Sequence, residues 1–147
     1  TVYKRTWYGV PVALKELRLQ KDSARENFAK EASLLAKCQA PNLVRLYGIS
    51  TLNQGTMVLE YMPQGSLYTV LHDEFDELPW VQRYQIAIGI ARGLFYLHTN
   101  KIIHGNLKSS NVLLDEEYNP KLSDFGLPKT KEVGAKKNDL SSIRWLA

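Results

Sequence analysis

The segment from Val81 to His98 restricts most strongly how this chain can fold. At 3.6 residues per turn, its apolar residues lie nearly all the way round a helix: Ile86, Ala87, Ile88, Ile90, Ala91, Leu94, Phe95 and Leu97. A helix of this kind normally lies at the centre of a core, so we expect a folded domain built around it. Because Arg92 interrupts the run and the run is short, we expect no membrane insertion.

The composition places the chain among ordinary globular domains. Of its 147 residues, 44% are hydrophobic and 23% are charged. These values exclude a disordered polar chain, a collagen-like repeat and a disulfide-dense scaffold. The net charge of +4 is small, and the basic residues are scattered except for a cluster of lysines near the C-terminus. We therefore expect no nucleic-acid partner, because a nucleic-acid binder concentrates basic charge on one face.

Cysteine and histidine usage points to a reducing compartment and away from a metal hydrolase. Cys38 is the single cysteine, so no internal disulfide can form, and no N-terminal signal peptide is visible. His72, His98 and His104 are far apart and lack ligand spacing. We expect a cytoplasmic protein, or the intracellular part of a larger one.

The residues before the long helix predict a small sheet with one helix against it. Strand formers and turns predict strands within Val2 to Leu17, then within Asn42 to Ser50 and Thr56 to Glu60. Between them, Ser23 to Cys38 has an apolar stripe of Phe28, Ala32 and Leu35 at helical spacing. Ser23 and Glu26 have the spacing of a capping box at its start. Ser66 to His72 predicts a further short helix.

A lysine and a glutamate in these elements stand out. Lys15 shares a strand face with apolar Ala13 and Leu17, and Glu31 lies inside the apolar stripe of the helix. Burying an unpaired carboxylate is costly, so Glu31 needs a partner. We expect an ion pair between Lys15 and Glu31, which would hold the lysine ready for phosphate oxygens.

Two polar motifs follow the long helix. The first, His104-Gly105-Asn106-Leu107-Lys108-Ser109-Ser110-Asn111, precedes the apolar run Val112 to Leu114. The second is Asp124-Phe125-Gly126, after a short strand. Carboxylate and amide oxygens bind hard cations, so Asp124 and Asn111 are candidate metal ligands.

Taken in order along the chain, these motifs resemble the protein kinase family. The match comprises Lys15, Glu31, the linker Glu60-Tyr61-Met62, the loop from His104 to Asn111, and Asp124-Phe125-Gly126. The residue pattern of the long helix resembles that of the tyrosine-kinase-like group. This group includes mixed-lineage, receptor-interacting and plant receptor-like kinases. Lys108-Ser109-Ser110-Asn111 is more similar to the serine/threonine members of that group.

The resemblance implies an α+β fold, a truncated form of the bilobal kinase fold. Residues 1–60 would form a small antiparallel-sheet lobe with one helix, without the Gly-rich loop. Residues 61–64 would be the hinge. Residues 65–147 would form the upper part of a mainly helical large lobe, with the catalytic loop and the activation segment. In such a fragment the helix from Val81 to His98 would expose a large apolar face.

The resemblance also implies a role for each matching residue. Lys15 would contact ATP phosphates and pair with Glu31, and Asn111 and Asp124 would hold Mg²⁺. Asn106 and Lys108 would occupy the catalytic-loop positions. Leu59 would be the gatekeeper, and Glu60 and Met62 would offer backbone groups to adenine. The apolar contacts to the adenine ring would come from Val2, Ala13 and Leu113. The apolar spine between the lobes would comprise Leu35, Leu46, His104 and Phe125.

The catalytic loop departs from the family pattern. The family has His-Arg-Asp where this chain has His104-Gly105-Asn106. An amide can accept a hydrogen bond from a substrate hydroxyl, but it cannot take up its proton at neutral pH. General-base catalysis contributes roughly 10²–10⁴-fold, so we expect severely impaired turnover. Gly105 also removes an arginine that clamps phosphorylated activation loops, and Pro128 replaces a non-proline residue.

Three functions remain open at this point. The first is an ATP- and Mg²⁺-binding pseudokinase that signals by conformation or scaffolding. The second is a weakly active serine/threonine kinase that transfers the γ-phosphate of ATP to protein hydroxyls. The third is an interaction module without nucleotide binding. The expected partners are ATP and either a protein substrate or a signalling protein.

Overall fold

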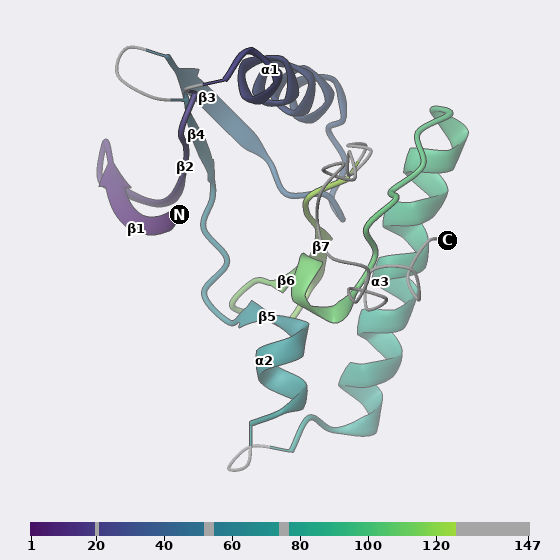
Figure 1. The fold of residues 1–147 in the computed structure, drawn as a ribbon. Coiled ribbons are helices and arrows are strands. Elements are labelled where there is room, and N and C mark those ends of the chain that lie inside the picture. Colours follow the sequence, from purple (N-terminus) through teal and green to yellow (C-terminus); the bar gives the residue numbers. More distant parts are fainter. Residues whose placement is uncertain (20, 52–54, 74–76, 126–147) are drawn as a thin grey trace, which may run out of the picture.

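The small lobe is an antiparallel sheet with one helix packed against it. The computed structural model describes residues 1–19, 21–51, 55–73 and 77–125. The sheet contains β1 (Val2–Trp7), β2 (Val10–Leu17), β3 (Leu46–Ser50) and β4 (Gly55–Glu60). These four strands pair in the order β1-β2-β4-β3, and α1 (Asp22–Lys37) lies beside them, as Figure 1 shows.

The second lobe follows a short connection after β4. It contains β5 (Gly65–Ser66), α2 (Leu67–Leu71), α3 (Trp80–Thr99), the 3₁₀ turn η1 (Ser109–Asn111), β6 (Val112–Leu114) and β7 (Pro120–Leu122). A three-stranded sheet in the order β5-β6-β7 lies near α2 and α3. This is the expected α+β arrangement of a truncated bilobal fold. The features named at Gly126 and Pro128, and the lysine cluster near the C-terminus, lie outside the described residues.

The first helix has the predicted face but a different start. Phe28, Ala32 and Leu35 are buried, and Glu31 lies among them with 4% of its surface exposed. The predicted capping box is wrong, because the helix begins at Asp22 and its N-cap is Lys21, which makes no side-chain cap bond. Ser23 is therefore inside the first turn. Asp22 instead places a carboxylate in the first turn, where the helix dipole favours negative charge.

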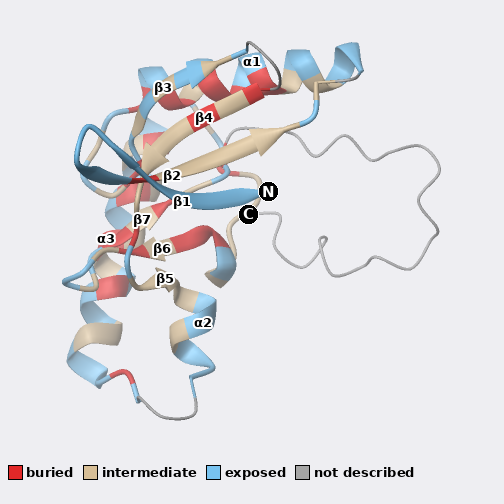
Figure 2. Ribbon diagram, turned by 90° about the vertical axis from the view of Figure 1, so that its left-hand side faces the viewer, coloured by how far each residue is buried: buried red, intermediate tan, exposed pale blue. Residues whose placement is uncertain are grey.

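Only one side of the long helix α3 is buried. Ile86, Gly89, Gly93 and Leu97 face the rest of the protein. On the other side Trp80 is 81% exposed and Phe95 is 74% exposed. Figure 2 shows the alternation of buried and exposed segments along this helix. The described structure therefore has the exposed apolar face that the sequence predicts.

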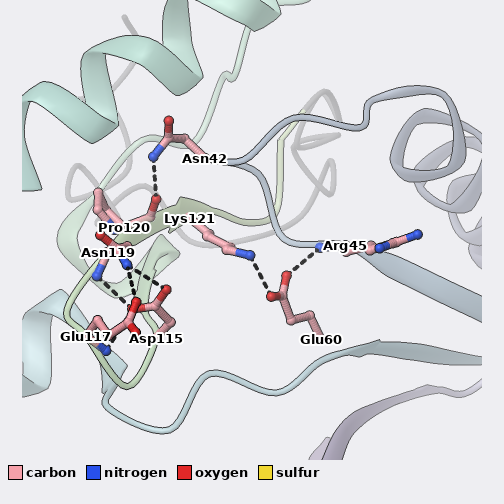
Figure 3. A network of polar contacts seen from close by, with 8 residues as sticks. All are labelled: Asn42, Arg45, Glu60, Asp115, Glu117, Asn119, Pro120 and Lys121. Atoms are coloured by element: carbon pink, nitrogen blue, oxygen red, sulfur yellow. Dashed lines mark hydrogen bonds and ion pairs between the residues drawn. The ribbon is translucent and has the colours of Figure 1, made fainter.

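A strap formed by residues 42–44 joins the two lobes. The Leu122 N–H donates to the Asn42 carbonyl at 2.8 Å, and the Val44 N–H donates to the Leu122 carbonyl at 3.0 Å. The Asn42 amide nitrogen also donates to the Pro120 carbonyl at 3.0 Å, as Figure 3 shows. These bonds hold β7 against the small lobe. Asp124 follows β7 by two residues, so the strap also places Asp124 near the small lobe.

Candidate active site

Lys15 lies between two carboxylates from distant parts of the chain. Its Nζ is 2.6 Å from Glu31 Oε1 on α1 and 2.8 Å from Asp124 Oδ1 after β7. Burial alone would lower the pKa of Lys15, but the charges and hydrogen bonds of Asp124 and Glu31 together outweigh it and raise that pKa. Lys15 is therefore cationic at neutral pH. The predicted pairing with Glu31 is present, and Asp124 is an additional partner.

Asp124 and Asn111 are held near each other by the residue between Leu122 and Asp124. The Ser123 N–H and hydroxyl both donate to the Asn111 carbonyl, at 2.9 Å and 3.1 Å. The Asn111 amide nitrogen donates to the Asn106 carbonyl at 2.7 Å, which leaves its side-chain oxygen as an acceptor. Asp124 has a φ of 54° and a side chain that is 45% exposed. This pair of hard oxygen donors fits a magnesium ion.

The loop from His104 to Asn106 is held by its own histidine. His104 is 1% exposed, and its Nδ1 accepts a hydrogen bond from the Asn106 N–H at 3.3 Å. Burial lowers the pKa of His104, opposed in part by backbone groups and by Asp124, so the ring is neutral at pH 7. Gly105 has a φ of 70°, a conformation that favours glycine. The backbone of Asn106 is thus fixed at both its N–H and its carbonyl.

The side chain of Asn106 is not fixed in the same way. It is half-buried and makes no hydrogen bond to any residue that the structure describes. Lys108, two residues later, is also half-buried. Both side chains are therefore partly open to solvent beside Asn111 and the 3₁₀ turn.

The residues expected around adenine come from three elements and the segment after β4. Val2 starts β1 opposite Lys15 and is 61% exposed, whereas Ala13 on β2 lies opposite Leu59 on β4. Leu113 lies on β6 and is half-buried. Met62 is buried.

Backbone groups at the end of β4 and just after it already make hydrogen bonds within the protein. The Glu60 N–H donates to the Arg45 carbonyl at 2.9 Å, so Glu60 would have only its carbonyl to offer. The Met62 carbonyl accepts from the Gly65 N–H at 3.0 Å. A carbonyl oxygen has a second lone pair, so this bond does not exclude a ligand.

The residues of the expected apolar spine lie together. Leu35 and Phe125 belong to one buried cluster, and Leu46 packs against it. The His104 ring meets the Phe125 ring edge-on, with centroids 6.2 Å apart. Leu59 packs against the same cluster. The helix that holds Glu31 and the segment that holds Asp124 therefore share a core.

A further ion pair, between Lys121 and Glu60, was not expected from the sequence. Lys121 Nζ on β7 donates to Glu60 Oε1 at 2.5 Å, and the other Glu60 oxygen accepts from the Arg45 N–H at 3.3 Å. Both side chains are only about one-fifth exposed, at 18% and 22%. Figure 3 shows this network linking the end of β4 to β7. The sequence indicates this ion pair only weakly, through a single lysine between Pro120 and Leu122, which are both buried.

The fold and this arrangement of residues define a protein kinase domain. The family model described as "Protein tyrosine and serine/threonine kinase" matches residues 1–147. The chain belongs to the protein tyrosine and serine/threonine kinase family.

Several relatives share this similarity over most of the chain. Cysteine-rich receptor-like protein kinase 10 of Oryza sativa subsp. japonica is 48% identical over 130 residues, which is 84% of this chain and 20% of that protein. Cysteine-rich receptor-like protein kinase 8 of Arabidopsis thaliana is 42% identical over 149 residues, 97% of this chain and 22% of that protein. A Dictyostelium discoideum protein named "Probable serine/threonine-protein kinase" is 38% identical over 156 residues, 99% of this chain and 12% of that protein. The chain thus spans about a fifth of the length of each receptor-like kinase and 12% of the length of the Dictyostelium protein.

Two features are absent from the part of the chain that the structure describes. No described helix combines the length and the apolar character needed to cross a membrane. No group of three or more His, Cys, Asp or Glu side chains in the described ranges is placed to hold a metal ion. Asn111 and Asp124 differ from such a group, because a magnesium site is completed by phosphate and water oxygens.

Proposed function

We propose that this chain is the ATP- and Mg²⁺-binding part of a pseudokinase with impaired phosphoryl transfer, which signals by conformation or scaffolding. One observation carries the proposal: Lys15, Glu31 and Asp124 form one ionic cluster, while the catalytic-loop position holds Asn106. The groups that favour nucleotide binding are in place. The group that would accept the substrate proton is missing.

In this proposal the cationic Lys15 binds ATP phosphates and the buried Glu31 keeps it in position. Asp124 and the side-chain oxygen of Asn111 hold Mg²⁺, which neutralises phosphate charge when bound. Glu31 is buried, with 4% of its surface exposed, whereas the Asp124 side chain is 45% exposed and can exchange Lys15 for a metal. The adenine ring lies among Val2, Ala13 and Leu113, with Leu59 behind it, and meets the backbone of Glu60 and Met62.

Asn106 explains the impaired transfer. Its side chain is half-buried and can position a hydroxyl, but an amide does not accept a proton at neutral pH. Its backbone is held by His104 and Asn111, so the amide side chain extends from a fixed position on the loop. Lys108 supplies positive charge on the same loop.

The second candidate is a weakly active serine/threonine kinase. It is favoured by the fixed backbone of the catalytic loop, because phosphoryl transfer rests largely on positioning and electrostatics. The Dictyostelium relative is named a serine/threonine-protein kinase. The substrate would then be a protein hydroxyl.

The likeness to named receptor-like kinases supports placing the chain in the tyrosine-kinase-like group. The end of the four-stranded sheet at Glu60 supports residues 1–60 as small lobe, 61–64 as hinge and 65–147 as partial large lobe. We also assign it to the cytoplasmic part of a larger protein. The partners would be ATP and a protein substrate or signalling protein.

A phosphate-transfer assay separates the pseudokinase from the weakly active kinase. Transfer of labelled phosphate from ATP to protein should be close to background in the wild type, and Asn106→Asp should raise it by roughly 10²–10⁴-fold, the usual contribution of a general base. The control is Asn106→Asp combined with Asp124→Asn, which should return transfer to background. Substantial transfer in the wild type that Asn106→Asp does not raise would favour the active kinase.

A further inference from the structure

The strand β1 is the exposed edge strand of the small lobe. All six of its residues are exposed, and Figure 2 shows the strand open to solvent along its length. In the order β1-β2-β4-β3 it has β2 as its neighbour on one side and lies at the edge on the other. A strand with so little buried surface opens readily unless further contacts hold it. The contacts that hold β1 therefore affect any ligand that lies beneath it.

Lys4 lies on the face of β1 that is turned toward the proposed nucleotide site. In the register of β1 and β2, Val2 pairs with Lys15. Lys4 pairs with Ala13. Paired residues of antiparallel strands point to the same face, and so do residues two positions apart in one strand. Lys4 therefore shares a face with three residues of the proposed site.

The ammonium group of Lys4 lies over the ring of Tyr61. Its Nζ is 4.4 Å from the ring centroid, within the range of a cation–π contact. Tyr61 is half-buried and directly follows the last residue of β4. Lys4 takes part in none of the ion pairs between described residues, so no carboxylate in the described part of the chain competes with the ring.

The segment that carries Tyr61 is fixed to the second lobe. Pro63 lies two residues later and has a restricted φ. The Gln64 N–H then donates to the Leu114 carbonyl on β6 at 3.2 Å. The contact of Lys4 with Tyr61 therefore joins the free edge of the small lobe to a segment that is anchored in the other lobe.

Each partner in this contact is close to a residue proposed to touch adenine. Lys4 is two residues from Val2 on the same face of β1. Tyr61 lies between Glu60 and Met62, whose backbone groups would meet the adenine edge. The adenine ring would therefore lie between the same two elements that the contact joins.

We infer that Lys4 and Tyr61 form a clasp between β1 and the segment after β4, and that this clasp slows the release of a bound nucleotide. Both are positioning residues, because they hold Val2 toward residues 60–62 and do not act on the phosphates. Release of the base separates these two elements and so breaks the clasp. The inference rests on the proposed function, since it concerns the same nucleotide site.

The test is the rate at which a ribose-labelled fluorescent ATP, bound with Mg²⁺, leaves the whole polypeptide that carries this sequence. Lys4→Met keeps a long side chain without the charge, and Tyr61→Leu removes the ring. Each should raise the dissociation rate about two- to fivefold, the factor that a cation–π contact at an exposed site contributes. The double variant should be no faster than either single variant, because both act through one contact. Lys4→Arg and Tyr61→Phe keep a cation and a ring, so they should stay close to the wild-type rate.

Arg5 and Tyr3 provide the matched control. The guanidinium carbon of Arg5 is 5.3 Å from the Tyr3 ring centroid, so this pair is also a cation–π contact. Both residues lie on the opposite face of β1 from Lys4. Arg5→Met should therefore leave the dissociation rate unchanged. Without nucleotide, amide hydrogen exchange within β1 should be faster in Lys4→Met and Tyr61→Leu than in Arg5→Met.

The proposed function and the clasp can fail separately. If the wild type binds no labelled ATP, the proposed function fails and the inference fails with it. If ATP binds but Lys4→Met and Tyr61→Leu release it at the wild-type rate, the inference alone is overturned. It is also overturned if their effects add in the double variant, if Lys4→Arg or Arg5→Met is as fast as Lys4→Met, or if β1 exchanges equally in all variants.

Discussion

At the scale of single residues, the two carboxylates beside Lys15 differ in what they can do. Glu31 is 4% exposed, so separating it from the lysine would leave a buried carboxylate without its partner. The Asp124 side chain is 45% exposed and has only one oxygen on Lys15. A metal ion or phosphate can therefore replace the Lys15–Asp124 contact without exposing a buried charge.

His104 should make stability depend on pH. Its pKa is lowered in the folded protein by burial, whereas in the unfolded chain it returns to about 6.5. Below about pH 6.5 the unfolded state therefore binds a proton that the folded state does not bind, and stability falls as the pH falls. Above that pH its contribution is constant. Denaturant unfolding between about pH 8 and pH 5 measures this slope.

The control for this prediction is His104→Leu. It should lower stability at neutral pH, because the Asn106 N–H loses its acceptor, but it should flatten the pH dependence. An unchanged slope in His104→Leu would contradict the assignment to His104.

At the scale of elements, α3 approaches the strap and β7 closely because it has glycines on its buried face. A Cβ atom on Gly93 would lie 2.9 Å from the Asn42 carbonyl oxygen and 2.9 Å from a Leu122 methyl carbon. The Asn42 oxygen is backbone and already accepts the Leu122 N–H, so it cannot easily move. The glycine therefore permits the contact that joins the lobes.

Gly93→Ala should destabilise the protein although alanine is the better helix former. The propensity gain is about 1 kcal/mol, and the overpacking cost is about 1–3 kcal/mol, so we expect a net loss of up to about 2 kcal/mol. The matched control is Ala91→Gly on the exposed side of α3, which should cost only the helix propensity, about 1 kcal/mol. Chemical denaturation measures both. A more stable Gly93→Ala would show that α3 can move away from the strap.

The elements that could be predicted from sequence are those with a local pattern. The stripe of Phe28, Ala32 and Leu35 has helical spacing, and the buried Glu31 implied a cation nearby. The capping box failed because helix starts depend on backbone geometry, and here the helix begins before Ser23. Resemblance to a family supplied the roles of the motifs, which no local pattern could give.

Contacts between lobes could not be predicted in the same way. The pair of Lys121 with Glu60 joins residues 61 positions apart, in two different sheets. Its formation depends on the register of β7 against the strap, which is a tertiary property. The ion pair of Asp124 with Lys15 joins residues 109 positions apart, and it too depends on how β7 packs against the small lobe. Lys15 and Asp124 were each identified from the sequence, but their direct contact was not predicted.

At the scale of the whole molecule, one face of α3 remains apolar and exposed. Trp80, Val81, Tyr84 and Phe95 are between 69% and 81% exposed on this helix. Exposed apolar patches of this kind promote association. The 147-residue polypeptide by itself should therefore aggregate or bind a partner.

Light scattering after size-exclusion chromatography tests this expectation. The wild-type 147-residue chain should elute above monomer mass, and Tyr84→Glu with Phe95→Glu should shift it toward monomer. The same charge placed at exposed Val10, on β2, serves as control and should not. A monomeric wild-type chain with one cooperative melting transition would contradict the expectation.

The proposed site for ATP and Mg²⁺ comprises Lys15, Glu31, Asn111 and Asp124. It is tested by the melting temperature of the whole polypeptide with and without Mg²⁺ and ATP, because a ligand that binds only the folded state stabilises it. We expect the melting temperature of the wild type to rise only when both components are present, and we expect no rise in Lys15→Ala or in Asp124→Asn. No rise in the wild type, with Lys15→Ala equally unresponsive, would contradict it and leave a module that binds no nucleotide.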